Sequence, residues 1–447
     1  MRYRNIDKIS AAATCIKDNM GNTVEILTPK NLNAAKAAFI EAAKEPFAEQ
    51  FRKESEGDIG NPSFPLELNP QFIYNEELLR KVADGGEKIA EALAIIQEYV
   101  IPENRRDEAV LELIEKRARQ AMKIALAAKS ILAKDDEATN SALSSVFDVP
   151  SKELCEKAID LYFENNKLTP EEKAKLSVIN AETRNKLSNI TEIGAEKLSW
   201  FFYRAMLYFD VPPWKVKISD NCAAIDVRDI NESGEPMIVI PKDRVVTGTK
   251  AAELICHEIF CHWRGSANGQ RFFRKILHGT PLEPLADILA KSPNETHYEG
   301  EAKMSDVWVN GGSSLPDALT IAVIDFASHG LSFVDVAYQV YKIRRQAGAS
   351  EDAALKTAWA KTYRILRGIT DAAKNKGCYA FTKDAAYFLG YKVARDHADD
   401  ELYRLYASME EEEIPVFASL FPEFAASARS IPFKTLIDNA IDIVLEG

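Results

Sequence analysis

Two of the six histidines in this chain lie five residues apart, as His257 and His262, and Glu258 directly follows the first. Neutral imidazoles are preferred zinc ligands, and a carboxylate beside them can accept a proton from an attacking water molecule. A zinc hydrolase needs both kinds of group close together. The sequence His257-Glu-Ile-Phe-Cys-His262 therefore predicts a hydrolytic metal site in which Glu258 is the general base.

The five-residue spacing puts a condition on this interpretation. An α-helix turns by about 100° per residue, so a step of five residues leaves the second imidazole about 140° from the first. We therefore expect the helix to be distorted between Glu258 and Arg264, by a π-turn or by local unwinding. On a regular helix the pair would be two histidines that are merely packed, and no metal site would form.

A third ligand is expected from the segment Asn294–Ala302, which reads as a second helix capped near Asn294. A carboxylate from a second helix commonly completes a site that already has two histidines. The segment offers these candidates: Glu295, Glu299, Glu301 and His297.

Several blocks in a fixed order give the chain a resemblance to a known family. They are His257–His262, Arg264, Asn268-Gly269, Tyr298-Glu-Gly-Glu-Ala302, Arg364-Ile-Leu-Arg-Gly368 and Phe381-Thr-Lys-Asp-Ala-Ala-Tyr387-Phe-Leu-Gly390. The chain resembles the metallopeptidases that include the microtubule-associated tyrosine carboxypeptidases and the bacterial proteins named for a Gln-Glu-Gly-Leu-Ala motif. The resemblance runs from about residue 70 to about residue 420. It implies that Glu299 is the third zinc ligand.

The chain departs from the family pattern at a few positions. Phe260-Cys261 stands where the family usually has Gly-Thr, and Tyr298 and Glu301 replace the Gln and Leu of the named motif. These changes affect the expected pocket shape and substrate more than metal binding. Cys261 lies between the two histidines, so its thiolate could compete for a soft metal. We expect it instead to be a small side chain that faces the core.

Further residues are expected to support the reaction. Tyr387 and Lys383 are candidates to stabilise an oxyanion, and their four-residue spacing puts both on one face of a helix, which would also suit an exposed surface. A carboxypeptidase also needs a cation for the substrate's terminal carboxylate, a role that the planar guanidinium of arginine suits. The candidates for this role are Arg367, Arg364 and Arg264, of which Arg367 is preferred for its place before Gly368.

The elements around these residues read as mostly helical. Helix-like spacing of apolar residues covers 76–133, 151–166 and 170–209, and Thr247-Gly-Thr249 caps a helix over 250–263. Short strands are predicted at 214–218, 223–227 and 236–240, with a turn at Asn231–Gly234, as in an antiparallel meander. We predict an α+β fold, predominantly helical, with a small antiparallel sheet packed on a zincin-like active-site helix and an N-terminal helical lobe.

The length of 447 residues suggests more than one core. The predicted units are an N-terminal segment of unknown function (1–69), a helical lobe (70–210), a zinc peptidase core (211–425) and a C-terminal helix (426–447). A connector with three prolines over 61–70 joins the first two units.

Composition narrows the expected partners. A formal net charge of −12, without a basic stripe, argues against nucleic acid. No stretch approaches 18 uninterrupted apolar residues and no signal-peptide core occurs at the start, so we expect no membrane insertion and a cytoplasmic protein. The six cysteines are too sparse for a disulfide framework, and most are expected to be buried small residues.

The expected function is zinc-dependent hydrolysis of peptide bonds, by a carboxypeptidase acting on peptide or protein C-termini. The alternative is a zinc-bound protein that serves as a scaffold without catalysis, although Glu258 would then have no purpose. A di-iron bundle is excluded, because no histidine has a glutamate three residues before it. A basic groove for acidic substrates would have to come from these residues: Lys342, Arg344, Arg345, Lys361 and Arg364. The oligomeric state is left open.

Overall fold

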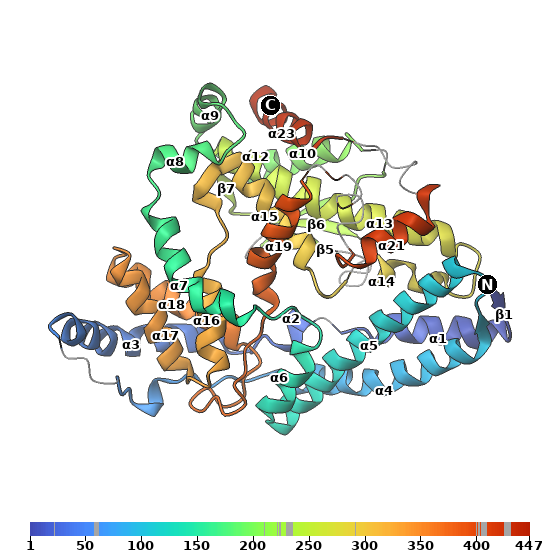
Figure 1. Ribbon diagram of the computed structural model, residues 1–447, viewed down its shortest axis with the longest axis horizontal. Coiled ribbons are helices and arrows are strands. Elements are labelled where there is room, and N and C mark those ends of the chain that lie inside the picture. Colours follow the sequence, from blue (N-terminus) through green and yellow to red (C-terminus); the bar gives the residue numbers. More distant parts are fainter. Residues whose placement is uncertain are drawn as a thin grey trace.

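The computed structural model describes the chain except for residues 22, 58–61, 210, 221, 223–224, 229–235, 291, 399, 401–402, 404–408 and 424–430. The described chain is predominantly helical, as predicted. Its helices form three groups, which lie at the lower right, lower left and top of Figure 1. Each group has a cluster of buried hydrophobic side chains, and a few long helices contribute to two of the three clusters.

The group at the lower right contains a long helical hairpin. Its first helix, α4, begins after Asn75, whose side chain accepts a hydrogen bond from the Leu78 amide, and α5 begins in the same way after Asn104. These two helices confirm the prediction for residues 76–133. The elements of this group are β1 (Arg2–Tyr3), α1 (Ile6–Asn19), α4 (Glu76–Tyr99), β2 (Val100–Ile101), α5 (Arg105–Ala133), η3 (Glu283–Leu285), α14 (Ala286–Leu289) and α21 (Glu413–Leu420).

The group at the lower left combines segments from both ends of the sequence. Ser332 and Ser350 cap two of its helices through hydrogen bonds from the amides of Asp335 and Ala353. Asn69, in the predicted connector, is buried and accepts a hydrogen bond from the Val334 amide. The elements are α2 (Thr23–Ile26), α3 (Leu32–Ser55), η1 (Leu66–Leu68), α6 (Asp136–Ser144), α7 (Lys152–Lys167), α16 (Leu319–Ser328), α17 (Phe333–Gln346) and α18 (Glu351–Leu366).

The group at the top holds the sheet and most of the predicted site residues. The elements are α8 (Pro170–Lys175), α9 (Ala181–Ser188), β3 (Ile193–Gly194), α10 (Ala195–Met206), β4 (Lys215–Ser219), β5 (Asp226–Arg228), β6 (Met237–Pro241), β7 (Val245–Val246), α12 (Gly248–Leu254), η2 (Ile255–Trp263), α13 (Arg264–Leu277), α15 (Thr296–Asn310), η4 (Gly311–Ser314), η5 (Lys383–Ala385), α19 (Ala386–Asp396) and α23 (Phe433–Glu446). The expected C-terminal helix is confirmed as α23, which packs against α10 and α12.

The three-stranded sheet differs from the predicted meander. Its order is β4-β6-β5, and β5 pairs antiparallel with β6, but β4 pairs parallel with β6. The prediction of an all-antiparallel meander is therefore wrong for β4. The apolar run of β6 is buried at every position and takes the centre, so the two less apolar strands flank it. The predicted turn at Asn231–Gly234 lies outside the described residues.

The other two sheets are small and antiparallel. They pair β1 with β2 and β3 with β7, two residues in each strand. Two of the three hydrophobic clusters draw on segments from both sides of the predicted boundary at 69/70, and all three draw on both sides of the boundary at 210/211. The groups of helices in space are therefore not consecutive stretches of the sequence.

The cysteines and the helix lengths complete the description. All six cysteines are free thiols, but only Cys256 and Cys261 are buried, so the expectation that most would be buried is wrong. Among the described residues, no helix combines the length and the apolar character needed to span a membrane.

Candidate metal centre

The histidine-bearing segment begins as an ordinary helix and then changes its winding. The Thr247 side chain accepts a hydrogen bond from the Lys250 amide and caps α12, as predicted. The helix continues without a break as η2, a π-helix over Ile255–Trp263, and then as α13. The predicted distortion between Glu258 and Arg264 is confirmed, and the π-helix begins earlier than expected, at Ile255.

The π-helical winding brings the two histidines to one side. A π-helix closes its hydrogen bonds five residues apart, so a five-residue step returns to nearly the same face. The ring centroids of His257 and His262 lie 4.8 Å apart. The segment can keep this rare winding because it is packed almost all round, with Ile255, Ile259 and Trp263 fully buried in the upper hydrophobic cluster.

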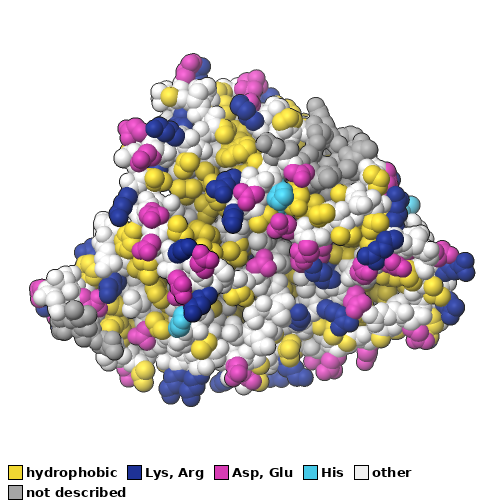
Figure 2. Space-filling model, viewed as in Figure 1, with side chains coloured by type: hydrophobic (Ala, Val, Ile, Leu, Met, Phe, Trp, Pro, Cys, Tyr) yellow, Lys and Arg dark blue, Asp and Glu magenta, His cyan; other side chains and the backbone are white. Residues whose placement is uncertain are grey.

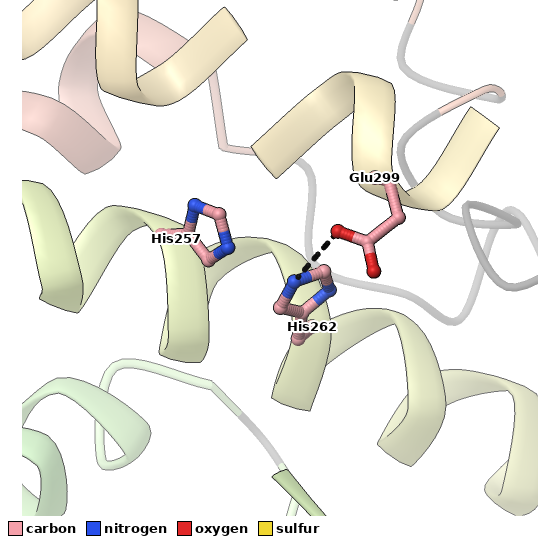
Figure 3. Close-up of side chains that lie close together, drawn as sticks. All are labelled: His257, His262 and Glu299. Atoms are coloured by element: carbon pink, nitrogen blue, oxygen red, sulfur yellow. Dashed lines mark ion pairs between the residues drawn. The ribbon is translucent and has the colours of Figure 1, made fainter. Parts of the chain in front are cut away.

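Glu299 reaches the two imidazoles from the neighbouring helix α15, as Figure 3 shows. Its Oε2 atom lies 3.5 Å from Nε2 of His262. One candidate ligand atom from each of His257, His262 and Glu299 lies within 4.8 Å of the others. Among the described residues this is the one group of three such side chains with the spacing of a metal site.

The other candidates for the third ligand are engaged elsewhere. Glu295 pairs with Lys383, with 3.1 Å between Oε2 and Nζ. Nε2 of His297 lies 3.0 Å from the carbonyl oxygen of Tyr403, and burial lowers the pKa of His297 to about 4. Glu301 is buried and lies near enough to Cys261 to raise the pKa of its thiol.

The donor set fits a catalytic zinc ion. Two imidazoles and one carboxylate are a known three-ligand set, which leaves a fourth position for water or substrate. Two ligand atoms of a tetrahedral zinc ion are about 3.4 Å apart, close to the distance between His262 and Glu299. Only small side-chain movements would then close the group around a metal.

Asp306 contacts His257, and sequence reasoning did not predict this contact. Its Oδ1 atom lies 3.0 Å from Nδ1 of His257, which leaves the Nε2 atom of that ring for a metal. Burial lowers the pKa of His257, but the Asp306 carboxylate outweighs this and raises it to about 9. Lys303 contacts the second oxygen of Asp306 at 3.3 Å. One signal was present, because Asp306 follows Glu299 by two helical turns and so shares its face.

Tyr298 fixes α15 against the π-helix. Its hydroxyl donates a hydrogen bond to the carbonyl oxygen of His262 at 2.7 Å and lies 2.9 Å from the hydroxyl of Ser266. The tyrosine ring lies against the His262 ring, with 4.3 Å between centroids. Tyr298 therefore holds the helix that carries Glu299 against the helix that carries the two histidines.

The environment of Glu258 changes the pKa of its carboxyl group. Burial raises the pKa of its carboxyl group to about 7, with smaller raising effects from Asp306 and Asp226, while His257 opposes them. A carboxyl group with a pKa near neutrality can both accept and return a proton at physiological pH.

Tyr387 and Arg364 also meet near the metal ligands. The Glu299 carboxylate, followed by burial, raises the pKa of Tyr387 well above its usual value, so the phenol keeps its proton. The Arg364 guanidinium lies close to the Tyr387 hydroxyl and opposes this rise in the pKa of the phenol.

Lys383 and Tyr387 were expected on one helix, but they lie in two consecutive elements. It sits in the short 3₁₀ turn η5, whereas Tyr387 is the second residue of α19. The ammonium group pairs with Glu295, one turn before Glu299 on the neighbouring α15. The pair ties the start of α19 to the start of α15.

Two of the three candidate arginines are buried. Arg367 has a side chain that is 10% exposed, contacts Asp384 at 3.2 Å and stacks on Phe381, with 4.5 Å from its guanidinium carbon to the ring centroid. Arg264 is buried and lies over Phe209. Arg364 shares Asp384 with Arg367, but its side chain is 48% exposed. Arg364, and not the preferred Arg367, therefore has an exposed guanidinium.

Cys261 faces the core, as expected. It is buried in the upper hydrophobic cluster, and burial raises the pKa of its thiol well above the usual value. A buried neutral thiol is a poor metal ligand, because metals bind the thiolate. It is not part of the metal-binding group.

Most of the cations named as possible contributors to a basic groove are paired with acidic groups. Lys342, Lys361 and Arg364 each pair with a carboxylate, of Glu54, Asp317 and Asp384 respectively. Figure 2 shows acidic and basic side chains interspersed over the visible face. Net positive charge therefore does not gather at these residues.

Comparison with known proteins gives no match: no protein-family model matches this chain, and no curated protein matches it.

Proposed function

We propose that this protein is a zinc-dependent peptidase that removes residues from the C-terminus of a peptide or protein. The observation that carries the proposal is the π-helix, because it brings His257 and His262 together with Glu299 into one potential ligand group. A π-helix is rare and is often found at functional sites. A packed, non-catalytic histidine pair would not require it.

Zinc bound by this group would polarise the scissile carbonyl and lower the pKa of water. Glu258, with a pKa of about 7, accepts a proton from the attacking water and then returns it to the leaving amine. The Tyr387 hydroxyl donates a hydrogen bond to the oxyanion that forms at the carbonyl. Asp306 holds the His257 ring in the orientation that presents Nε2.

The cleavage of terminal residues is supported by Arg364. Its guanidinium is half exposed, is fixed on one side by Asp384 and lies close to Tyr387 beside the ligand group. An arginine held in this way can bind the free carboxylate of a substrate C-terminus through two parallel hydrogen bonds. A cation at that place favours substrates that end near the metal.

The test combines metal analysis with peptide digestion. Wild type, Glu258→Gln and Glu283→Gln, an exposed carboxylate beside His278, are purified and analysed for zinc. Each is then incubated with a peptide library whose products are identified by mass spectrometry. We expect one zinc per chain in all three, with loss of C-terminal residues in wild type and Glu283→Gln and at least 1000-fold slower cleavage in Glu258→Gln.

Two results would count against the proposal. Stoichiometric zinc without cleavage of any library member by wild type would favour the scaffold role. Cleavage that persists in Glu258→Gln would remove the carboxylate from the mechanism.

A further inference from the structure

Helices α15 and α19 pack side by side and cross at two glycines. A Cβ atom added to Gly300 would lie 2.0 Å from the carbonyl carbon of Gly390. A Cβ atom added to Gly390 would lie 1.7 Å from the carbonyl oxygen of Thr296. Such distances are far inside van der Waals contact, so the two backbones touch where only glycine fits.

The crossing lies beside the groups proposed to act on the substrate. Gly300 directly follows Glu299 on α15, and Gly390 follows Tyr387 by three residues, or nearly one turn, on α19. The Lys383–Glu295 pair holds the same two helices together one turn away. The backbone contact therefore determines how far Tyr387 lies from the ligand group.

We propose that the Gly300–Gly390 crossing is a positioning device, which holds the Tyr387 hydroxyl at the reacting carbonyl. This inference rests on the proposed peptidase function. An added methyl group at Gly390 would push α19 away from α15 by on the order of 1 Å, because neither backbone can give way at the contact. A displacement of that size at a reacting group can reduce a rate about 100-fold.

The effect should appear in kcat and not in metal binding. His257 and His262 lie on η2, and Glu299 is held on α15 through Tyr298, so displacement of α19 leaves the ligand set in place. The Gly390→Ala variant should therefore contain one zinc per chain and lose about 100-fold in kcat, with a change in KM below about threefold.

A double-mutant cycle separates positioning from general damage. Wild type, Gly390→Ala, Tyr387→Phe and the double variant are compared with a peptide substrate. If Gly390 acts through Tyr387, the double variant should be no slower than Tyr387→Phe alone, because the hydroxyl is already gone. The control is Gly194→Ala, where an added Cβ meets no atom within 4 Å and activity should not change.

The inference would be overturned if the double variant lost activity by the product of the two single losses. It would also be overturned if Gly390→Ala kept full activity. If Gly390→Ala does not fold, 3-fluorotyrosine at position 387 of the otherwise wild-type chain gives a second measurement. Its fluorine resonance should shift when zinc is added, and an unchanged resonance would overturn the positioning. If wild type binds zinc and shifts this resonance but cleaves nothing, the peptidase proposal fails and the placement of Tyr387 stands.

Discussion

At the scale of single residues, the contact between Asp306 and His257 should make metal binding depend on pH. The carboxylate favours the protonated ring and raises the pKa of His257 to about 9. A metal needs the ring neutral, so binding must release that proton. The same carboxylate also fixes the ring orientation, which strengthens binding once the proton has left.

Zinc affinity should therefore rise with pH. Between pH 7 and pH 9 the raised pKa of His257 means that one proton competes with the metal, so affinity should increase about tenfold per pH unit. Zinc titration against a competing chelator at several pH values measures this dependence. An affinity that is constant over this range would contradict the assigned role of Asp306.

The matched variant is Asp306→Asn. It removes the charge that raises the pKa of His257, so the slope between pH 7 and pH 9 should become shallow. At pH 9, where only about half of the wild-type His257 rings still carry the proton, the variant should bind zinc about 10- to 100-fold more weakly than wild type. Asp317→Asn removes a carboxylate that pairs with Lys361 and should bind zinc as wild type does.

Alanine substitutions of Arg364 and Arg367 should affect different properties, catalysis in the first case and stability in the second. Arg364→Ala should lower kcat/KM about 100-fold for a peptide with a free C-terminal carboxylate, but change little for the same peptide with a C-terminal amide. Arg367→Ala should instead destabilise the fold by about 3 kcal/mol, because it removes a buried partner of Asp384. Kinetics with the two peptides and thermal unfolding separate these outcomes. Equal losses on both peptides in Arg364→Ala would refute the carboxylate contact.

Residue types and spacing predicted part of the site. The five-residue spacing of His257 and His262 required a helix distortion, and that requirement followed from helix geometry alone. Arg367 was ranked above Arg364 because sequence position does not reveal which guanidinium stacks on Phe381. Asp306 was missed because its significance depends on the distance between two helices.

At the scale of elements, the π-helix η2 lets a five-residue step bring two side chains to one face, as a four-residue step does in an α-helix. Its upstream and downstream neighbours, α12 and α13, are regular helices with buried faces of their own. A π-segment between them absorbs one residue without rotating either face out of the core.

Shortening and lengthening this segment by one residue should therefore have opposite effects on zinc binding. Deletion of Cys261 shortens the step between the two histidines to four residues, so a regular helix would bring the rings within about 40° of each other and zinc binding should survive. Insertion of alanine after Cys261 makes the step six residues, which turns His262 away and should abolish binding. Isothermal titration with zinc measures both.

An alanine inserted after Gly279, in the turn that follows α13, is the control and should leave binding intact. Loss of zinc from the deletion variant despite a folded circular dichroism spectrum would show that the π-winding does more than adjust the register.

The sequence predicted helices better than strand pairing. Helix starts such as Thr247, Ser332 and Ser350 are local, because one side chain caps the backbone three residues on. The pairing of β4 with β6 depends on which strand lies at the centre of the sheet. That strand is β6, because its residues are buried on both faces. Turn signals between strands do not contain this information.

At the scale of the whole molecule, a buried ionic network joins the α4–α5 hairpin to the segment before α21. Glu410 and Glu413 both contact Arg117, whose side chain is 1% exposed, at 3.3 Å and 2.7 Å. Lys116 contacts Glu410 at 2.7 Å, and the Ser292 hydroxyl donates to its other oxygen. These contacts link segments nearly 300 residues apart, so the network reports on assembly of the lower-right group.

The network should make the free energy of unfolding depend on pH in the acidic range. Burial alone would raise the pKa of Glu410, but Arg117 and its hydrogen bonds outweigh burial and lower it to about 2. Since the folded pKa lies below the unfolded value of about 4.5, the carboxylate stabilises the fold above that pH. The contribution of about 3 kcal/mol is lost progressively as the pH falls from about 4.5 to about 2.

Glu410→Gln should therefore lower the free energy of unfolding by about 2 to 3 kcal/mol at pH 7 and by much less near pH 2.5. Urea unfolding followed by circular dichroism at both pH values measures the difference. Glu412→Gln is the matched control, because Glu412 also pairs with Lys116 but is 70% exposed, so it should change stability by less than about 0.5 kcal/mol. Equal destabilisation by both variants would mean that surface charge, and not the buried pairing with Arg117, holds α21 against the hairpin.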